Sequence, residues 1–405
     1  MTEPTDRSRG IVHEIRWRDA LPWWLLFRAA GQAFAPTVIL LGMLGSLATW
    51  AGWSVADQAG LAGVSRALVA TANDAARSAV DDQITLPLPD GRLSASDYAA
   101  ALEPSREVLP WLGRLVDRLP PTVGDVLRLV AVPFRPTTTF ADMGGALARI
   151  GWFVLVWSIF GTAISRHVAL GLVGEDAPGP VAATLYGSRK WVAAFNAVLF
   201  VLLGMVLLAI PGVLIGLAMR TEWGLAFAGA VWPLVLAGAV VLAILAVGVV
   251  AGWPLMVATV GVERGDSFQA ISTAFSYLYQ RPLEYAAYLL LALAVAVPTV
   301  AAAGLFADAT ATLAMRAASF GMGPDRTAAV IDGLTSMTPT TAAGDAGRWG
   351  LAALGFWLRG LRTLLASFGW GYFWAIATAA YVLLRQDVDG TELDEVVLDE
   401  PGSSV

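Results

Sequence analysis

The chain has 405 residues, of which 57% are hydrophobic and 14% are charged, and its formal net charge at pH 7 is −6. Soluble domains carry about 25% charged residues, so this composition excludes an ordinary water-soluble protein. The absence of cysteine excludes disulfides, thiolate nucleophiles and cysteine-ligated metals. The acidic charge is concentrated in residues 386–405, which hold seven Asp and Glu and no Lys or Arg. A near-neutral body with an acidic tail gives no reason to expect nucleic acid as a partner.

The apolar residues are arranged in runs of membrane-spanning length. A helix needs about 20 apolar residues to cross a hydrocarbon core of roughly 30 Å. The runs are continuous rather than alternating and are rich in Ala, Leu and Gly, which favours helices over a barrel. We therefore predict an all-α fold: a polytopic transmembrane bundle of about six spans, with interfacial helices and a mainly helical extramembrane insert.

The N-terminal part leads into the membrane. Residues 1–32 are predicted to form a cytoplasmic tail and an interfacial helix, because Trp and Arg alternate along residues 14–31 as they do at the headgroup level. Residues 33–53 are predicted as the first transmembrane helix, acting as an uncleaved anchor. Residues 54–145 are the extramembrane insert, whose apolar stripes indicate helices interrupted by prolines.

Residues 146–304 are predicted as the core membrane bundle, with spans near 151–173, 191–219 and 283–304. The stretch 224–262 is too long for one untilted span. Pro233 and Pro254 leave two alternatives, a kinked or extended helix or a span followed by a re-entrant piece.

The remaining elements complete the span count. Residues 305–348 are predicted as a second extramembrane region, 349–385 as an interfacial helix with the last transmembrane helix, and 386–405 as an acidic disordered tail. Six spans put both termini on one side, and five arginines before the first span favour the cytoplasm. We expect a multi-pass protein of the bacterial inner membrane.

Two polar segments inside the bundle, 175–190 and 263–282, share a layout that suggests an internal repeat. With an offset of 88 residues, Ala182 matches Ala270, Ser188 matches Ser276, and Trp191 matches Tyr279. Two interpretations remain open. The segments mark two related halves that enclose a site, as in many transporters, or they are two independent interfacial helices with a few matching small residues.

No catalytic, cofactor or metal motif is present in the sequence, and we expect a protein that is not an enzyme. The middles of the predicted spans lack charged residues, so Asn196 is the candidate polar site within the bundle. Besides membrane lipids, we expect a protein partner that docks on the insert 54–145 or on the acidic tail. The candidate docking residues of the tail are Asp387, Asp389, Glu392, Asp394 and Glu395.

Several short segments resemble a family of uncharacterised polytopic membrane proteins of planctomycete-type bacteria. They are residues 21–28 (LPWWLLFR), 252–256 (GWPLM) and 277–282 (YLYQRP), and above all 381–396 (YVLLRQDVDGTELDEV), which is similar to a YLLLRxDVDGTExDEV-like motif. The resemblance implies membrane localisation and carries no functional residue over to this chain.

These features lead to two functional expectations. The first is a non-enzymatic membrane scaffold or assembly component. The alternative is an uncoupled transporter or flippase of small or lipidic solutes, built from two related halves. A pocket lined by Asn196 would favour the transporter, and a close-packed interior would favour the scaffold.

Overall fold

The structure is a computed structural model that describes residues 22–59, 126, 129–130, 132, 140–335 and 345–391. Within these residues all regular structure is helical and no strand occurs. Six helices of this described part are long and apolar enough to span a membrane. The predicted all-α, multi-span fold is therefore confirmed.

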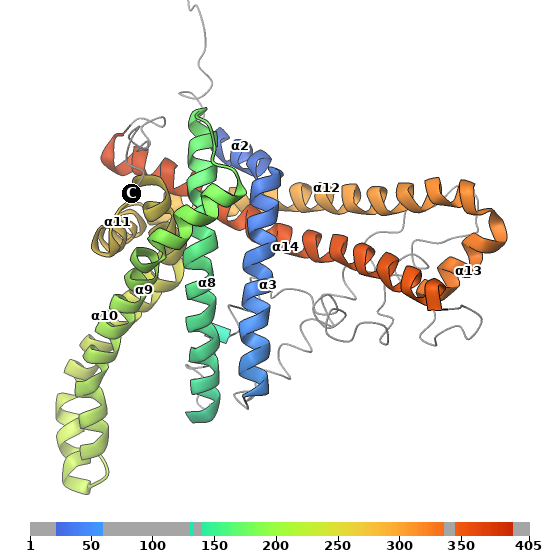
Figure 1. Cartoon of the computed structure of the whole chain (residues 1–405). Helices are drawn as coiled ribbons and strands as arrows, with labels where there is room; N and C mark the ends of the chain where they lie inside the picture. Colours follow the sequence, from blue (N-terminus) through green and yellow to red (C-terminus); the bar gives the residue numbers. More distant parts are fainter. Residues whose placement is uncertain are drawn as a thin grey trace, which may run out of the picture.

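The first three described helices form one packed unit. Helix α2 (Trp24–Gln32) leads into α3 (Pro36–Gln58), and α3 lies antiparallel to α8 (Phe140–Val173) (Figure 1). At the far end of this pair Asp57 forms an ion pair with Arg149, and the indole of Trp53 donates to the carbonyl of Arg149 at 3.1 Å. These contacts fix where α8 begins relative to α3.

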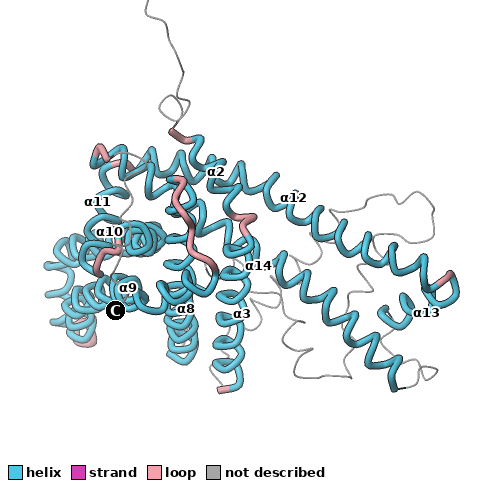
Figure 2. The backbone as a smooth tube through the Cα atoms, turned by 45° about the horizontal axis from the view of Figure 1, so that its top comes forward, coloured by secondary structure: helices cyan, strands magenta, loops and turns pink. Residues whose placement is uncertain are grey.

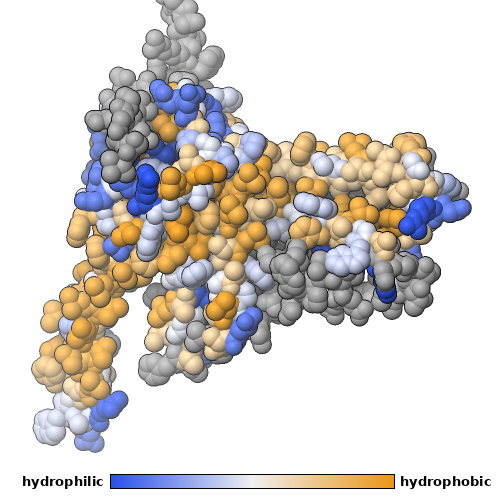
Figure 3. All heavy atoms as spheres, in the orientation of Figure 1, coloured by the Kyte–Doolittle hydropathy of each residue, from blue (hydrophilic) through white to orange (hydrophobic). Residues whose placement is uncertain are grey.

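Helices α9 (Pro180–Ala218) and α10 (Glu222–Glu263) form a long apolar hairpin. The turn is closed by Thr221, whose hydroxyl accepts from the backbone N–H of Gly224 at 3.0 Å. Both Pro233 and Pro254 lie inside α10 without ending it, so the stretch 224–262 is one continuous helix rather than a span with a re-entrant piece. Most of the hairpin's large apolar side chains are exposed, and Figure 3 shows the hairpin as a hydrophobic arm.

The C-terminal helices form a second arm. Helix α10 ends at Glu263, and the next residue, Arg264, is left-handed with a φ of 62°. Asp266 then caps α11 (Ser267–Gln280) by accepting from the N–H of Gln269 at 2.8 Å. Then follow α12 (Pro282–Met322), α13 (Pro324–Thr335) and α14 (Asp345–Asp389). Figures 1 and 2 both show α12 and α14 running at a large angle to α3 and α8, with α13 at the tip.

Several helices continue through boundaries that the sequence predicts. The segment 175–190 is not a separate helix, because α9 starts at Pro180 and continues unbroken. Much of 305–348 belongs to α12 and α13, and residues 349–385 lie within the single helix α14. The reason is that a helical backbone satisfies its own hydrogen bonds and continues through polar side chains, so a change in composition is not a helix end. Most of the insert 54–145, and residues 1–21 and 392–405, lie outside the described residues.

An aromatic cluster fills the centre of the bundle. The ring centroids of Trp157 and Trp370 are 4.9 Å apart, and those of Trp253 and Trp374 are 5.2 Å apart. Gly161 leaves room for the ring of Trp374, since a Cβ atom at this position would lie only 2.8 Å from that ring. Trp157 and Trp374 are fully buried, so the interior between α8, α10 and α14 is occupied by side chains.

Candidate functional site: a polar hub at the helix ends

The richest polar cluster of the described residues lies where the ends of long helices meet around α11. Antiparallel order brings the end of α10, the start of α12 and the end of α14 to one side of the molecule (Figure 1). We call this cluster the polar hub. Its members are Glu263, Gln269, Tyr277, Arg281, Glu284, Tyr288, Tyr381, Arg385, Asp387 and Asp389.

Glu263, the last residue of α10, is the centre of the polar hub. Its Oε1 accepts from Arg385 Nε at 3.0 Å and from the hydroxyl of Tyr381 at 2.5 Å, and its Oε2 accepts from Gln269 Nε2 at 2.8 Å. The side chains of Glu263 and Arg385 are each only 14% exposed. This mostly buried carboxylate therefore has three hydrogen-bond donors, one of which, Arg385, also carries the opposite charge. Such pairing is suited to a structural contact between α10, α11 and α14.

Two tyrosines hold the end of α14. The hydroxyl of Tyr277 on α11 donates to the carboxylate of Asp389, and that of Tyr288 on α12 donates to Asp387 Oδ2 at 2.7 Å. Arg281 also donates to the backbone carbonyl of Asp387 at 3.4 Å. Burial, and then the hydrogen bond with Asp389, raise the pKa of Tyr277 above its ordinary value, so its hydroxyl stays protonated and remains a donor.

These contacts correct the interpretation of the acidic tail. Asp387 and Asp389 are part of helix α14 and bond to tyrosines of the same chain, so the acidic segment begins within a helix. The other three candidate docking residues, Glu392, Asp394 and Glu395, lie outside the described residues.

Beside the polar hub, basic and tyrosine side chains bond to the last carbonyls of α10. Arg166 is 2% exposed, donates to the carbonyl of Val262 at 3.4 Å, and has its guanidinium 5.5 Å from the ring centroid of Tyr186. Tyr186 donates to the carbonyl of Val260 at 2.8 Å, and Lys190 Nζ donates to that of Arg264 at 3.0 Å. The end of a helix leaves carbonyls without helical donors and attracts positive charge, which accounts for these groups.

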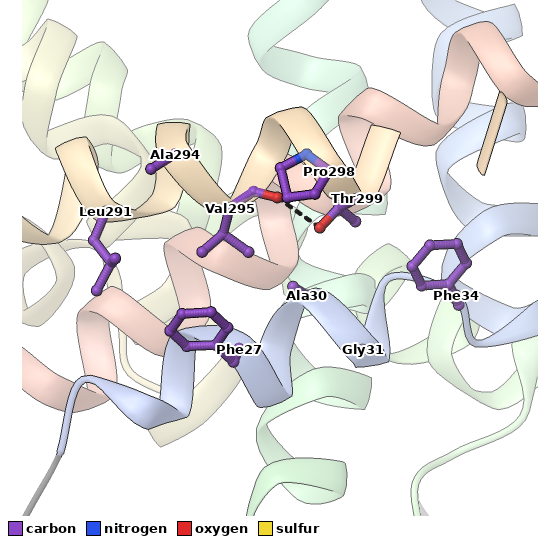
Figure 4. A pocket seen from close by; sticks show the side chains of 9 residues that line it. All are labelled: Phe27, Ala30, Gly31, Phe34, Leu291, Ala294, Val295, Pro298 and Thr299. Atoms are coloured by element: carbon purple, nitrogen blue, oxygen red, sulfur yellow. Dashed lines mark hydrogen bonds between the residues drawn. The ribbon is translucent and has the colours of Figure 1, made fainter. Parts of the chain in front are cut away.

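Asn196, the predicted polar site, is not in the polar hub. It lies half-buried on α9, one to two turns after Lys190. A cavity of about 450 Å³ lies elsewhere, between α2 and α12 (Figure 4), and Asn196 does not line it. The structure therefore does not bring Asn196 together with the cavity.

Sequence reasoning missed the residues of the polar hub as a site. Glu263, Tyr277, Tyr381 and Arg385 all lie in or next to the segments that carry the family resemblance. Each lies at or near the end of an apolar run, and its pairing partners come from distant parts of the chain. Acids, arginines and tyrosines occur at the ends of successive predicted spans, and this pattern in the sequence could have indicated the polar hub.

Within the described residues, no group of three or more His, Asp or Glu side chains is arranged to hold a metal ion. No known family model matches this chain, and comparisons with curated proteins and with solved structures find no match either. The resemblance to the planctomycete-type family stays a prediction.

Proposed function

We propose that the protein is a non-enzymatic membrane scaffold. In this proposal the polar hub joins the helix ends, and the apolar arms made by α9–α10 and α12–α14 contact other membrane proteins. The observation that supports it best is the mutual pairing inside the polar hub. Glu263, Asp387 and Asp389 accept hydrogen bonds from side chains of the same chain, which is the chemistry of a joint rather than of a reactive centre.

The filled interior favours a scaffold over a transporter. A solute pathway built between two halves needs polar groups or unwound helix at the middle of the membrane. Here the interior of the bundle is occupied by Trp157, Trp370 and Trp374, and α10 stays helical through both of its prolines. The cavity between α2 and α12 is apolar and lies apart from Asn196.

The hairpin offers a surface for lateral contacts. Gly212 and Gly216 are a Gly-x-x-x-Gly pair on α9, and a Cβ added at either position would meet no other atom within 4 Å. Such pairs allow a helix from another protein to approach closely. By contrast, Gly248 of α10 already faces Phe275 of the same chain, with a built Cβ only 2.4 Å from its ring.

We further place the polar hub on the cytoplasmic face of the bacterial inner membrane. Its side of the molecule carries Arg189, Lys190, Arg264 and Arg281, and five arginines precede α3. A surplus of Arg and Lys favours retention on the cytoplasmic side.

The scaffold proposal is tested by site-specific crosslinking in native membranes. A Gly212→Cys variant has the only cysteine of the chain, and a thiol crosslinker should join it to other membrane proteins. An Ala274→Cys variant, at a buried position of α11, is the control and should give no such product. The proposal fails if Gly212→Cys gives no product, and if purification in mild detergent recovers no partner with residues 392–405 either present or deleted.

A further inference from the structure

The cavity between α2 and α12 is an apolar crevice at the edge of the bundle. Its walls are formed on one side by Phe27, Ala30, Gly31 and Phe34, and on the other by the turns of α12 from Leu291 to Thr299. Figure 4 shows Phe27 facing Leu291 and Val295 at one end, and Phe34 near Thr299 at the other. Along α2 the small residues Ala30 and Gly31 lie between the rings of Phe27 and Phe34.

The lining offers no free side-chain donor to a polar ligand and only one side-chain acceptor, the hydroxyl oxygen of Thr299. Thr299 has the only side-chain hydroxyl in the crevice, and this group already donates to the carbonyl of Val295 at 2.7 Å (Figure 4). A water molecule needs two to four polar partners to stay in a cavity. An apolar crevice left empty would lose dispersion contacts along its whole wall. The occupant that these walls favour is therefore a hydrocarbon.

The crevice also lies at the right level for a lipid chain. One turn before Phe27, Trp23 and Trp24 are 38% and 48% exposed, and the ring of Trp24 stacks on Phe27 with centroids 5.1 Å apart. Exposed tryptophans of this kind mark the headgroup level of a bilayer. The mouth of the crevice is thus next to the lipid headgroups, and its groove follows α12 for about 12 Å at 1.5 Å per residue.

We propose that this crevice binds one acyl chain of a membrane phospholipid as a defined site, distinct from the lipid that covers the exposed helix faces. A volume of about 450 Å³ falls within the roughly 300–1,000 Å³ typical of small-molecule sites. Helix α2 is held against the bundle by Leu26, Ala29 and Ala30, which are 0–6% exposed, so the wall that faces α12 is preformed. This site is independent of the scaffold proposal.

Gly31 allows the crevice to be filled without disturbing the fold. A Cβ at Gly31 meets no atom within 4 Å, so Gly31→Leu projects into the open groove and also removes a residue of low helix propensity. Gly229→Leu is the matched control, because it makes the same change at an equally open, exposed position on α10 of the hairpin. Ala294→Leu, on the opposite wall, fills the crevice from α12.

The test reconstitutes the full chain into vesicles of phosphatidylcholine and phosphatidylglycerol containing a diazirine-bearing phosphatidylcholine. After photolysis, labelled peptides are mapped by mass spectrometry. Labelling of residues 27–34 and 291–299 should exceed that of the exposed α9–α10 faces several-fold. This labelling should fall at least fivefold in both Gly31→Leu and Ala294→Leu and stay unchanged in Gly229→Leu. Uniform labelling of all lipid-exposed faces, or labelling unaffected by both filling variants, would overturn the proposal.

Discussion

Close backbone approaches show how single residues decide the packing of this bundle. At Gly187, where α9 crosses α8, a Cβ atom would lie 2.2 Å from the carbonyl oxygen of Ile159. Since that oxygen belongs to a helical backbone, it cannot move aside as a side chain would. The matched position Gly204 on the same helix is open, with no atom within 4 Å of an added Cβ.

We therefore expect Gly187→Ala to destabilise the protein by about 1–3 kcal/mol, the usual cost of overpacking. Gly204→Ala should be neutral or stabilising by up to about 1 kcal/mol, because alanine is the better helix former. Thermal unfolding in detergent compares the two variants. Equal effects would show that α9 does not cross α8 through Gly187.

Glu263 and Arg385 give a second prediction at the residue scale. Glu263→Gln keeps the shape of the side chain but removes the charge that accepts from Arg385 Nε and Tyr381. We expect each of Glu263→Gln and Arg385→Gln to reduce the free energy of unfolding by a few kcal/mol, since breaking a mostly buried pair costs about 3–5 kcal/mol when the pair is fully buried.

A double-mutant cycle measures the interaction free energy between Glu263 and Arg385 separately from their contacts with other residues. The double variant should lose less stability than the two single variants combined, by about 0.5–3 kcal/mol. Additive losses in the cycle would mean that the two side chains do not interact.

At the scale of elements, the end of α14 is held by α11 and α12. The clasp consists of Tyr277 with Asp389 and Tyr288 with Asp387. The two aspartates, Asp387 and Asp389, lie at the start of the acidic segment, so the clasp holds the last turn of α14. Gly390, with a φ of 67°, ends the helix in the left-handed conformation that glycine adopts most readily.

The combined variant Tyr277→Phe, Tyr288→Phe should speed hydrogen exchange of the amides of residues 385–391, by about tenfold for each 1.4 kcal/mol of lost local stability. Tyr285→Phe is the control, because Tyr285 also lies near the start of α12 but donates to Ala251 of α10 at 2.8 Å. Equal acceleration by the control would exclude a specific clasp.

The raised pKa of Tyr277 sets the pH range of this effect. A tyrosine whose folded pKa is raised contributes stability that is complete below its unfolded value of about 10 and is lost only as the pH rises through the folded value. The difference in exchange between the wild type and the Tyr277→Phe, Tyr288→Phe variant should therefore be the same at pH 7 and at pH 9, after correction for intrinsic exchange rates. A difference that shrinks by pH 9 would show that Tyr277 titrates early.

At the scale of the whole molecule, the helices meet at one side and diverge from it. From Lys190 to its end at Ala218, the hairpin helix α9 covers about 42 Å at 1.5 Å per residue, close to the roughly 40–45 Å of a bilayer with its headgroups. The large angle of α12 and α14 to α3 and α8 (Figures 1 and 2) means that these helices cannot all lie near the normal of one flat bilayer. When α3 and α8 lie along the membrane normal, α12 and α14 are therefore strongly tilted away from that normal.

The hairpin makes the orientation testable with unique cysteines. Asp176→Cys, in the exposed loop before α9, should react with an impermeant maleimide only when the cytoplasmic side is accessible, and Arg220→Cys at the tip should react in intact cells. Reversed labelling would invert the proposed orientation. Labelling of both positions from the same side would show that α9 does not cross the membrane.

The sequence by itself determined the all-helical class and the multi-span character. The bilayer requires each crossing segment to satisfy its own backbone hydrogen bonds over a fixed thickness, so apolar run length is a local signal. Helix ends were less predictable, as at Pro180, since polar side chains within 175–190 did not interrupt the helix.

Only the tertiary structure decided which polar groups meet. Glu263 and Arg385 are far apart in the chain, and each alone is an ordinary charged residue at the end of an apolar run. The packing of α10 against α11 and α14 turns them into a buried pair and brings Tyr277 to Asp389. Asn196 is the candidate polar residue in the middle of a predicted span, but it belongs to neither the polar hub nor the lining of the crevice. The position of a residue along a predicted span follows from the sequence of one helix, whereas a site is formed by side chains from several helices.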